Sequence, residues 1–200
     1  MGLNGVEVYT PNDKPFGLTY GQWTAKWWKW VLSVPSTNNP LLDDSGSLAD
    51  VNQSGPVWFL AGTLGEHKCP ERSCQLPTGK SVLFPVINYE ANLVENPELS
   101  SNQQLIKHVM EDMNDIVVKE ATVDGEKVCV YRIHSNPFIF DMRLERTNIL
   151  KLSPQTINVA ADGYWVFLKP LKQGKHEIYF HGSCSGGTRS SAAIYHINVS

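Results

Sequence analysis

Tryptophan is concentrated in one short segment near the start of the chain, which holds four of the six tryptophans, at positions 23, 27, 28 and 30. Thr19 and Gln22, at the start of this segment, have the spacing of a capping box. In a capping box both side chains accept hydrogen bonds from backbone N–H groups at the start of a helix. Pro35 predicts that the helix ends near Val34, because the residue before a proline avoids the helical conformation. The sequence therefore predicts an α-helix over residues 20–34.

The apolar side chains of this predicted helix recur at helical spacing and form one stripe. The stripe consists of Tyr20, Trp23, Trp27, Trp30, Val31 and Val34. Aromatic side chains at this spacing are typical of a packed core, so we expect the stripe to lie against a sheet. Trp28 falls at the edge of the stripe and is expected to be partly exposed.

A second amphipathic helix is predicted over residues 102–118, where Ser101 and Gln104 repeat the capping-box spacing. Pro85 lies within a short apolar run, which predicts an edge strand or a bulge there. The C-terminal third contains strand-like runs at hairpin spacing, separated by turn residues such as Asp162-Gly163. The strands predicted in this region are 156–160, 164–168, 175–181 and 191–199.

The order of these elements predicts a mainly β fold of the α+β class. Strands at hairpin spacing, without regular alternation of strands and helices, favour antiparallel pairing. We therefore predict an antiparallel two-sheet β-sandwich, jelly-roll-like, decorated by the two amphipathic helices. The 200 residues are expected to form a single domain, 1–200, in which the N-terminal segment 1–18 is irregular.

Charge and hydropathy exclude several classes of partner. The formal net charge is −3, so no general attraction to nucleic acid is expected. No apolar run approaches the roughly 20 residues that span a bilayer. The first residues, MGLNGVEVY, lack the basic and apolar regions of a secretory signal. We expect either a cytoplasmic protein or an extracytoplasmic one whose signal has been removed, and no motif identifies a cofactor.

Two of the four cysteines are close in sequence. Cys69 and Cys74 bracket a polar tetrapeptide, a spacing that suits a disulfide closing a hairpin in an oxidising compartment. We predict this disulfide. A zinc site is the weaker alternative, because Cys129 and Cys184 stand alone and supply no second close pair.

Cys184 lies in the sequence Gly-Ser-Cys-Ser-Gly, which has the spacing of a nucleophile elbow. A thiol hydrolase would use Cys184 as nucleophile, His181 or His196 as base, and Glu90 or Asp141 as the orienting acid. The elbow requires a strand, a turn and a helix, whereas a further strand is predicted after this motif. A cysteine in a hairpin loop is therefore the favoured interpretation.

His176 and His196 lie on two predicted strands of one hairpin. In one register they are direct cross-strand neighbours, and a slip of one residue separates them. A metal bound by this pair would need a third ligand, and Glu90 is the residue that the sequence offers. A metal-assisted hydrolase would use His176 or His181 together with Glu90. Histidines that form hydrogen bonds within the sheet are the favoured alternative.

Four motifs are spread along most of the chain: YGQWTAKWWKW at 20–30, GPVWFLAG at 55–62, PTGKSVLFPVIN at 77–88 and DGYWVFLKPL at 162–171. Together they resemble the markers of an uncharacterised protein family of archaea and bacteria. The Trp-rich helix is the most specific part of the resemblance. The resemblance implies no activity, but many members carry secretory signals, which keeps the extracytoplasmic alternative open.

Three functions compete on these observations. Non-catalytic binding of a small molecule or glycan is the leading hypothesis, with Trp28, Trp58, Trp165 and Asn88 as candidate contacts, because aromatic faces stack on sugar rings. A hydrolase using Cys184 or a histidine metal site is the alternative. The third is an assembly protein that pairs through a sheet edge, with residues 1–18 as the donated segment.

Overall fold

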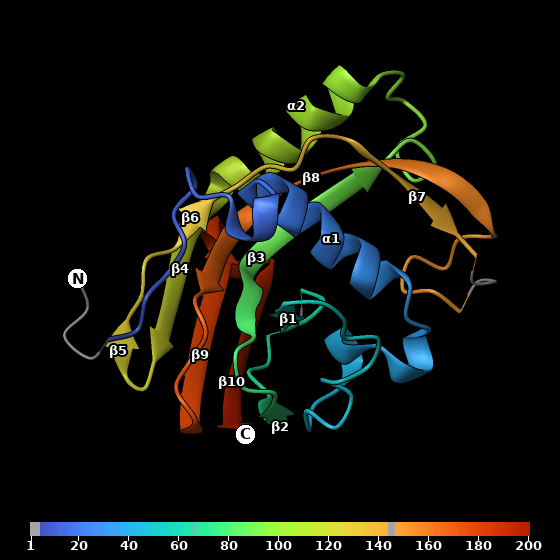
Figure 1. The fold of residues 1–200 in the computed structure, drawn as a ribbon. Helices are drawn as coiled ribbons and strands as arrows, with labels where there is room; N and C mark the ends of the chain where they lie inside the picture. The colour runs from blue at the N-terminus through green and yellow to red at the C-terminus, as the bar shows by residue number, and fades with distance from the viewer. Residues whose placement is uncertain (1–4, 66, 144–146) are drawn as a thin grey trace.

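The computed structural model describes residues 5–65, 67–143 and 147–200, and these form two helices and two five-stranded sheets (Figure 1). The helices are α1 (Tyr20–Leu32) and α2 (Asn102–Asp112). The strands are β1 (Val57–Phe59), β2 (Glu71–Leu76), β3 (Ser81–Asn92), β4 (Ile116–Val123), β5 (Glu126–Lys127), β6 (Tyr131–Arg132), β7 (Phe138–Met142), β8 (Gln155–Leu168), β9 (Gly174–Cys184) and β10 (Ser190–Val199). Short 3-10 turns occur at Pro15–Gly17, Ser36–Asn38, Pro40–Leu42, Met113–Asp115 and Ser185–Gly187. The predicted mainly β fold with two helices is confirmed.

Both sheets are mixed rather than purely antiparallel. Sheet A has the order β1-β3-β8-β6, with β7 also paired to β8, and sheet B has the order β2-β10-β9-β4-β5. Strands β1 and β3 pair in parallel, as do β2 and β10, and the other neighbours are antiparallel. The chain leaves sheet A after β1, forms β2 in sheet B and returns as β3, which provides the long crossover that the parallel β1–β3 pair needs. Strands β2 and β10 are joined by all the elements from β3 to β9.

The tryptophan stripe of α1 packs on one face of sheet A, as its spacing predicts. The capping box is formed: the Gln22 backbone N–H donates to Thr19 Oγ1 at 3.3 Å, and the Thr19 backbone N–H donates to Gln22 Oε1 at 2.9 Å. Trp27 is fully buried against Trp165 of β8, with 5.4 Å between ring centroids. Its indole N–H donates to the Leu60 carbonyl at 2.8 Å. The helix is thus fixed to the sheet at its centre.

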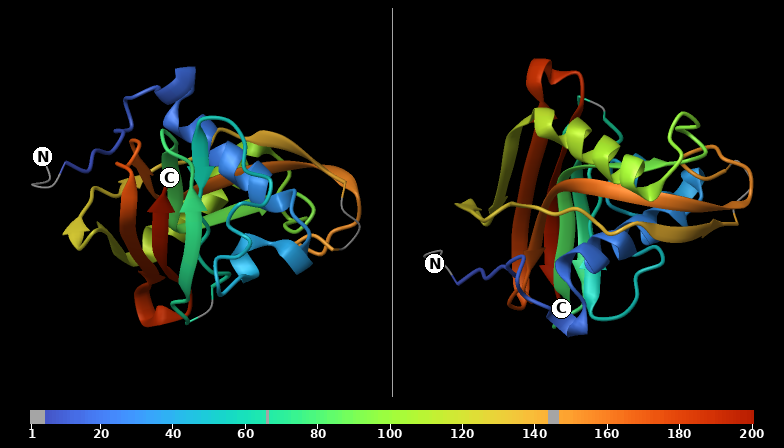
Figure 2. Two further views of the ribbon diagram at one scale, coloured as in Figure 1. Left: turned by 60° about the horizontal axis from the view of Figure 1, so that its bottom comes forward. Right: turned by 90° about the horizontal axis from the view of Figure 1, so that it is seen from above.

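Sheet B and α2 cover the opposite face of sheet A. Phe84 of β3 and Phe180 of β9 stack between the two sheets, with 4.9 Å between ring centroids. Ala91 of β3 and Ala160 of β8 form a smaller apolar cluster with α2. Figure 2 shows α1 and α2 on opposite sides of β8, so sheet A is the middle layer of the molecule.

Strand β8 is continuous where the sequence predicts two strands and a turn. Asp162 and Gly163 lie inside the strand, opposite Tyr89 and Asn88 of β3. A Cβ atom added to Gly163 would lie 2.6 Å from the Cβ of Asn88, so glycine is needed for close approach of two strands rather than for a turn. The Asp162 carboxylate pairs with the Arg132 guanidinium at 2.7 Å.

A bulge in β3 decides which way its second half faces. The register between β3 and β8 shifts between Pro85 and Ile87, which confirms a bulge at the proline and excludes an edge strand, since β3 lies between β1 and β8. Leu83 before the bulge belongs to the core under α1. The extra residue reverses the alternation, so Asn88 and Glu90 after the bulge also face α1.

The predicted helix 102–118 is too long at its C-terminal end. Helix α2 stops at Asp112, a 3-10 turn follows, and β4 begins at Ile116. Residues 116–118 are all β-branched, and pairing with β9 satisfies their preference for extended structure.

Candidate functional site

A cavity of about 450 Å³ lies between α1, the second half of β3 and the start of β10. Its lining consists of Trp27, Trp28, Leu41, Thr63, Leu64, Gly65, Ile87, Asn88, Tyr89, Glu90, Glu95, Asn96, Ile149, Leu150, Arg189, Ser190 and Ser191. The volume is within the range of about 300–1,000 Å³ that small-molecule sites occupy. We call it the Trp28 cavity.

Two tryptophans form the aromatic wall of the Trp28 cavity. Trp27 and Trp28 meet edge to face, with 5.1 Å between ring centroids and 89° between ring planes. Trp28 is only 7% exposed, so the structure does not confirm the partial exposure that the sequence predicts. Its indole N–H is buried and has no hydrogen-bond partner among the described residues.

Strand β3 supplies the polar groups on the opposite wall. Asn88 lies opposite Gly163 and Glu90 lies opposite Ala161, so small residues of β8 leave room beside both side chains. The Asn88 amide nitrogen is buried and has no partner within the described part of the chain. A buried donor without a partner is costly, so each such group favours an acceptor supplied from elsewhere.

Glu90 is the buried acid of the Trp28 cavity, with 7% of its surface exposed. Asn92 donates to its carboxyl at 3.5 Å and to the Glu95 carboxylate at 2.5 Å, so two acids share one amide. The pKa of Glu90 is raised to about 8, chiefly by burial and also by the charge of Glu95, while the hydrogen bond from Asn92 acts in the opposite direction. At neutral pH the folded protein therefore holds this carboxyl mostly protonated.

The remaining wall joins the segment after β1 to the start of β10. The Thr63 backbone N–H donates to Ser191 Oγ at 3.3 Å. Gly62 allows this contact, because a Cβ there would overlap the Ser191 hydroxyl. The Thr63 hydroxyl itself is buried and unpartnered among the residues the structure describes. Three residues that line this cavity, Thr63, Trp28 and Asn88, thus each have a buried polar atom without a partner among the described residues.

The structure brings together three residues that the sequence analysis assigned to different roles. Trp28 and Asn88, predicted ligand contacts, line the Trp28 cavity with Glu90, a predicted catalytic acid and metal ligand. Trp58 and Trp165 do not join them: Trp58 lies in the core between the sheets, and Trp165 lies in the core under α1.

Most of the cavity lining was not predicted from the sequence, and Thr63 and Glu95 are the residues among these that the site depends on. Thr63 follows the GPVWFLAG motif directly, and Glu95 follows β3 in a polar segment. Neither has a motif of its own, and their proximity depends on the tertiary fold.

The predicted thiol hydrolase set is not assembled. Cys184 faces inward with Ile87 and Met113, and its sulfur accepts from the Arg189 backbone N–H at 3.2 Å. His181 is three residues earlier on β9, and an odd separation places it on the opposite face of the strand. The Thr188 hydroxyl and the Arg189 N–H lower the pKa of the Cys184 thiol.

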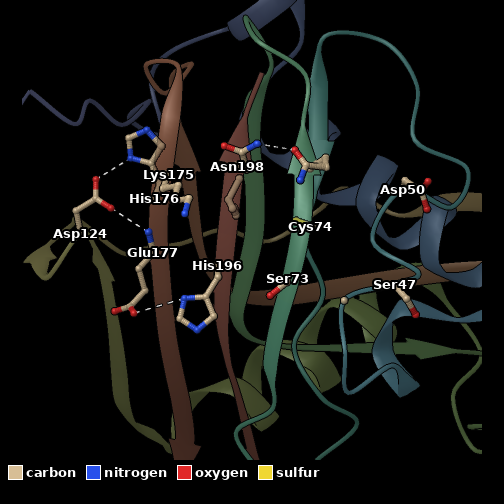
Figure 3. Close-up of a pocket in the computed structure, with 13 residues that line it drawn as sticks. Ser47, Asp50, Ser73, Cys74, Asp124, Lys175, His176, Glu177, His196 and Asn198 are labelled. Carbon is tan, nitrogen blue, oxygen red and sulfur yellow. Dashed lines mark hydrogen bonds and ion pairs between the residues drawn. The ribbon is translucent and has the colours of Figure 1, made fainter.

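The histidine pair is separated by one step of register. His196 lies opposite Glu177, and His176 lies opposite the buried Ile197, so the two imidazoles are on opposite faces of sheet B. Figure 3 shows each with its own acidic partner: His176 Nδ1 is 2.7 Å from Asp124, and His196 Nδ1 is 3.7 Å from Glu177. The direct pairing that the metal prediction required does not occur, and within the described residues no cluster of three metal-ligating side chains is found.

The residues of Figure 3 line a larger depression, of about 810 Å³, which is bordered by β2, β9 and β10 of sheet B and by the segment around Ser47 and Asp50. Some of its polar side chains have partners on the protein, such as Asn198, which donates to the Gln75 side chain at 2.8 Å, and none of its lining residues has a buried polar side-chain atom without a partner among the described residues. The Trp28 cavity differs because three of its lining residues, Trp28, Thr63 and Asn88, each have a buried polar atom without a partner, and we take it as the candidate site.

The predicted disulfide between Cys69 and Cys74 is absent, and both cysteines are free thiols. Residues 71–76 form the single strand β2 rather than the two arms of a hairpin. Cys74 lies inside this extended strand, which does not fold back toward Cys69 as the second arm of a hairpin would.

The N-terminal segment pairs within its own chain. The Tyr9 N–H donates to the Phe167 carbonyl at 2.8 Å, and the Lys169 N–H donates to the Glu7 carbonyl at 2.8 Å. Residues 7–9 of this segment therefore lie along the end of β8.

Comparison with known proteins gives no family. No family model and no curated protein matches the chain. A solved structure described as "Structure of PbICP-C in complex with falcipain-2" is 10% identical, covering 71% of this chain and 98% of that chain, with a TM-score of 0.29. A TM-score this low carries no argument about function. In the described part of the chain, none of the helices has the length and apolar character required to cross a bilayer.

Proposed function

We propose that this protein binds a small organic molecule in the Trp28 cavity without catalysing a reaction. The observation that carries the proposal is that three residues lining one cavity with an aromatic wall each have a buried, unpartnered polar atom. Protein interiors satisfy nearly all buried polar groups, so three exceptions at one place favour a ligand that supplies acceptors.

The proposal is preferred to thiol hydrolysis because Cys184 and His181 face opposite sides of β9. It is preferred to binding of an extended glycan because the unpartnered groups lie inside a cavity of about 450 Å³ rather than along an open surface. A ligand of one or two rings, with oxygen acceptors, fits this volume and these donors.

A thermal-shift screen with small ring compounds, followed by calorimetry on each compound that stabilises the protein, tests the proposal. Trp28→Phe keeps an aromatic ring and removes the indole N–H, and is expected to weaken binding about five- to tenfold through the loss of one hydrogen bond. Trp58→Phe is the matched control, because Trp58 is equally buried with an unpartnered N–H but lies in another core.

Two results would overturn the proposal. One is that no compound stabilises the protein. The other is that Trp28→Phe and Trp58→Phe leave the affinity of every ligand equally unchanged.

A further inference from the structure

We propose that the ligand of the Trp28 cavity carries a protonated amine that pairs with Glu90 and an aromatic or apolar body that lies against Trp28. This inference rests on the proposed function and names the chemical class of the ligand. Three features of the cavity support it: the acids Glu90 and Glu95, the wall formed by the two tryptophans, and the unpartnered N–H groups of Trp28 and Asn88.

The acids of the cavity have no cation of their own among the described residues. Glu90 is buried, Glu95 lies at the rim, and the group between them is the neutral amide of Asn92. The cationic side chain in the lining is Arg189, and its guanidinium is bound to the Asp112 carboxylate and main-chain carbonyl. An ammonium group from the ligand would supply the missing positive charge.

The aromatic wall suits the same ligand. An aromatic or apolar body gains contact with the Trp27 and Trp28 side chains, which meet edge to face at this wall. The unpartnered N–H groups of Trp28 and Asn88 require an acceptor on the ligand as well. The ligand is therefore expected to be bifunctional, with an ammonium group at one end and a hydroxyl or carbonyl oxygen elsewhere.

Glu90 is also suited to release a proton when an amine binds. Its pKa is raised to about 8 by burial and by Glu95, so at pH 7 the free protein holds the proton. An ammonium group beside the carboxyl favours the ionised form, and the proton then leaves to solvent. The other titratable groups around Glu90 are Tyr89, which contacts His108 of α2, and Arg189 with Asp112.

Two matched pairs of probes test the inference by calorimetry at pH 7: tyramine against tyrosol, and benzylamine against benzyl alcohol. Each pair differs only in amine against hydroxyl. The amine of at least one pair is expected to bind about tenfold more tightly than its alcohol, as a charge-assisted hydrogen bond predicts. Repeating the titration in buffers of different ionisation enthalpy is expected to show release of most of one proton.

Glu90→Gln is expected to remove both the preference for the amine and the proton release, with alcohol binding changed by less than about threefold. Glu98→Gln, an exposed acid in the same connection, is the control and is expected to retain both. Equal affinity for amine and alcohol, or a preference that survives Glu90→Gln, would overturn the inference. If neither amine binds while neutral compounds from the thermal-shift screen do, the amine class is wrong and the proposed function stands.

Discussion

Glu90 shows how a single residue acquires an unusual environment from its neighbours. The side chain is buried, its neighbouring acid Glu95 is negatively charged, and one weak amide contact from Asn92 is its hydrogen bond. The sequence offered Glu90 as an acid for catalysis or metal binding without indicating its burial. Burial depends on α1 and β10 closing over β3, which no local pattern around Glu90 reveals.

The raised pKa of Glu90 predicts a pH dependence of stability. The folded protein keeps the Glu90 proton up to about pH 8, whereas the unfolded chain loses it near pH 4.5. Between these values the unfolded state binds fewer protons, so the free energy of unfolding falls as pH rises, by at most roughly 1.4 kcal/mol per pH unit from this group. Below pH 4.5 and above about pH 8 the contribution is constant.

Urea unfolding of the ligand-free protein from pH 4 to pH 9 checks this expectation. Glu90→Gln cannot ionise, so its stability relative to the wild-type protein is expected to rise steadily between about pH 4.5 and 8. Glu98→Gln serves as the control for removing one exposed acid. Stability curves of Glu90→Gln and wild type that stay parallel over this range would show that Glu90 is not held protonated.

At the scale of elements, the sequence predicted best where local and tertiary preferences agree. Helix α1 has its capping box, its apolar stripe and a stop signal in sequence, and the structure forms it as Tyr20–Leu32. The turn predicted at Asp162-Gly163 is wrong, because glycine occurs both in turns and where two strands approach closely. Here Gly163 leaves space for the Asn88 side chain of the neighbouring strand, which only the pairing of the two strands reveals.

The bulge in β3 limits prediction of the site for a related reason. Pro85 indicated an irregularity, but alternation counted through an undisturbed strand would place Asn88 and Glu90 on the face away from α1. The one extra residue at the bulge turns both side chains toward the Trp28 cavity. An error of one residue in such a count assigns every later side chain of the strand to the wrong face of the sheet.

Strand β2 carries a prediction about the cysteines. Because residues 71–76 form one extended strand, Cys69 and Cys74 are held too far apart to bond, and all four cysteines are expected to be thiols. Thiol titration of protein denatured without reductant is expected to give four thiols per chain, and three for Cys69→Ser. A value of two for the unreduced wild-type protein would mean that a disulfide forms and that β2 is misplaced.

At the scale of the whole molecule, the middle sheet positions the site. Sheet A is covered by α1 on one face and by sheet B and α2 on the other (Figure 2). The Trp28 cavity opens where β3 extends beyond its bulge under α1 and meets the start of β10. The layers could be predicted from the sequence, because each layer has an apolar face. The position of the Trp28 cavity between them could not be predicted, because it depends on how the ends of these elements meet in the folded chain.

The indole N–H resonances of the six tryptophans provide the most direct test of the central claim, that a ligand is held at Trp28. In a two-dimensional ¹⁵N–¹H spectrum, the Trp28 indole peak, assigned by Trp28→Phe, is expected to move downfield on titration with a compound that stabilises the protein, because its free N–H gains an acceptor. The peaks of Trp58 and Trp165 are expected to stay in place. A stationary Trp28 peak while a stabilising compound saturates the protein would contradict the account.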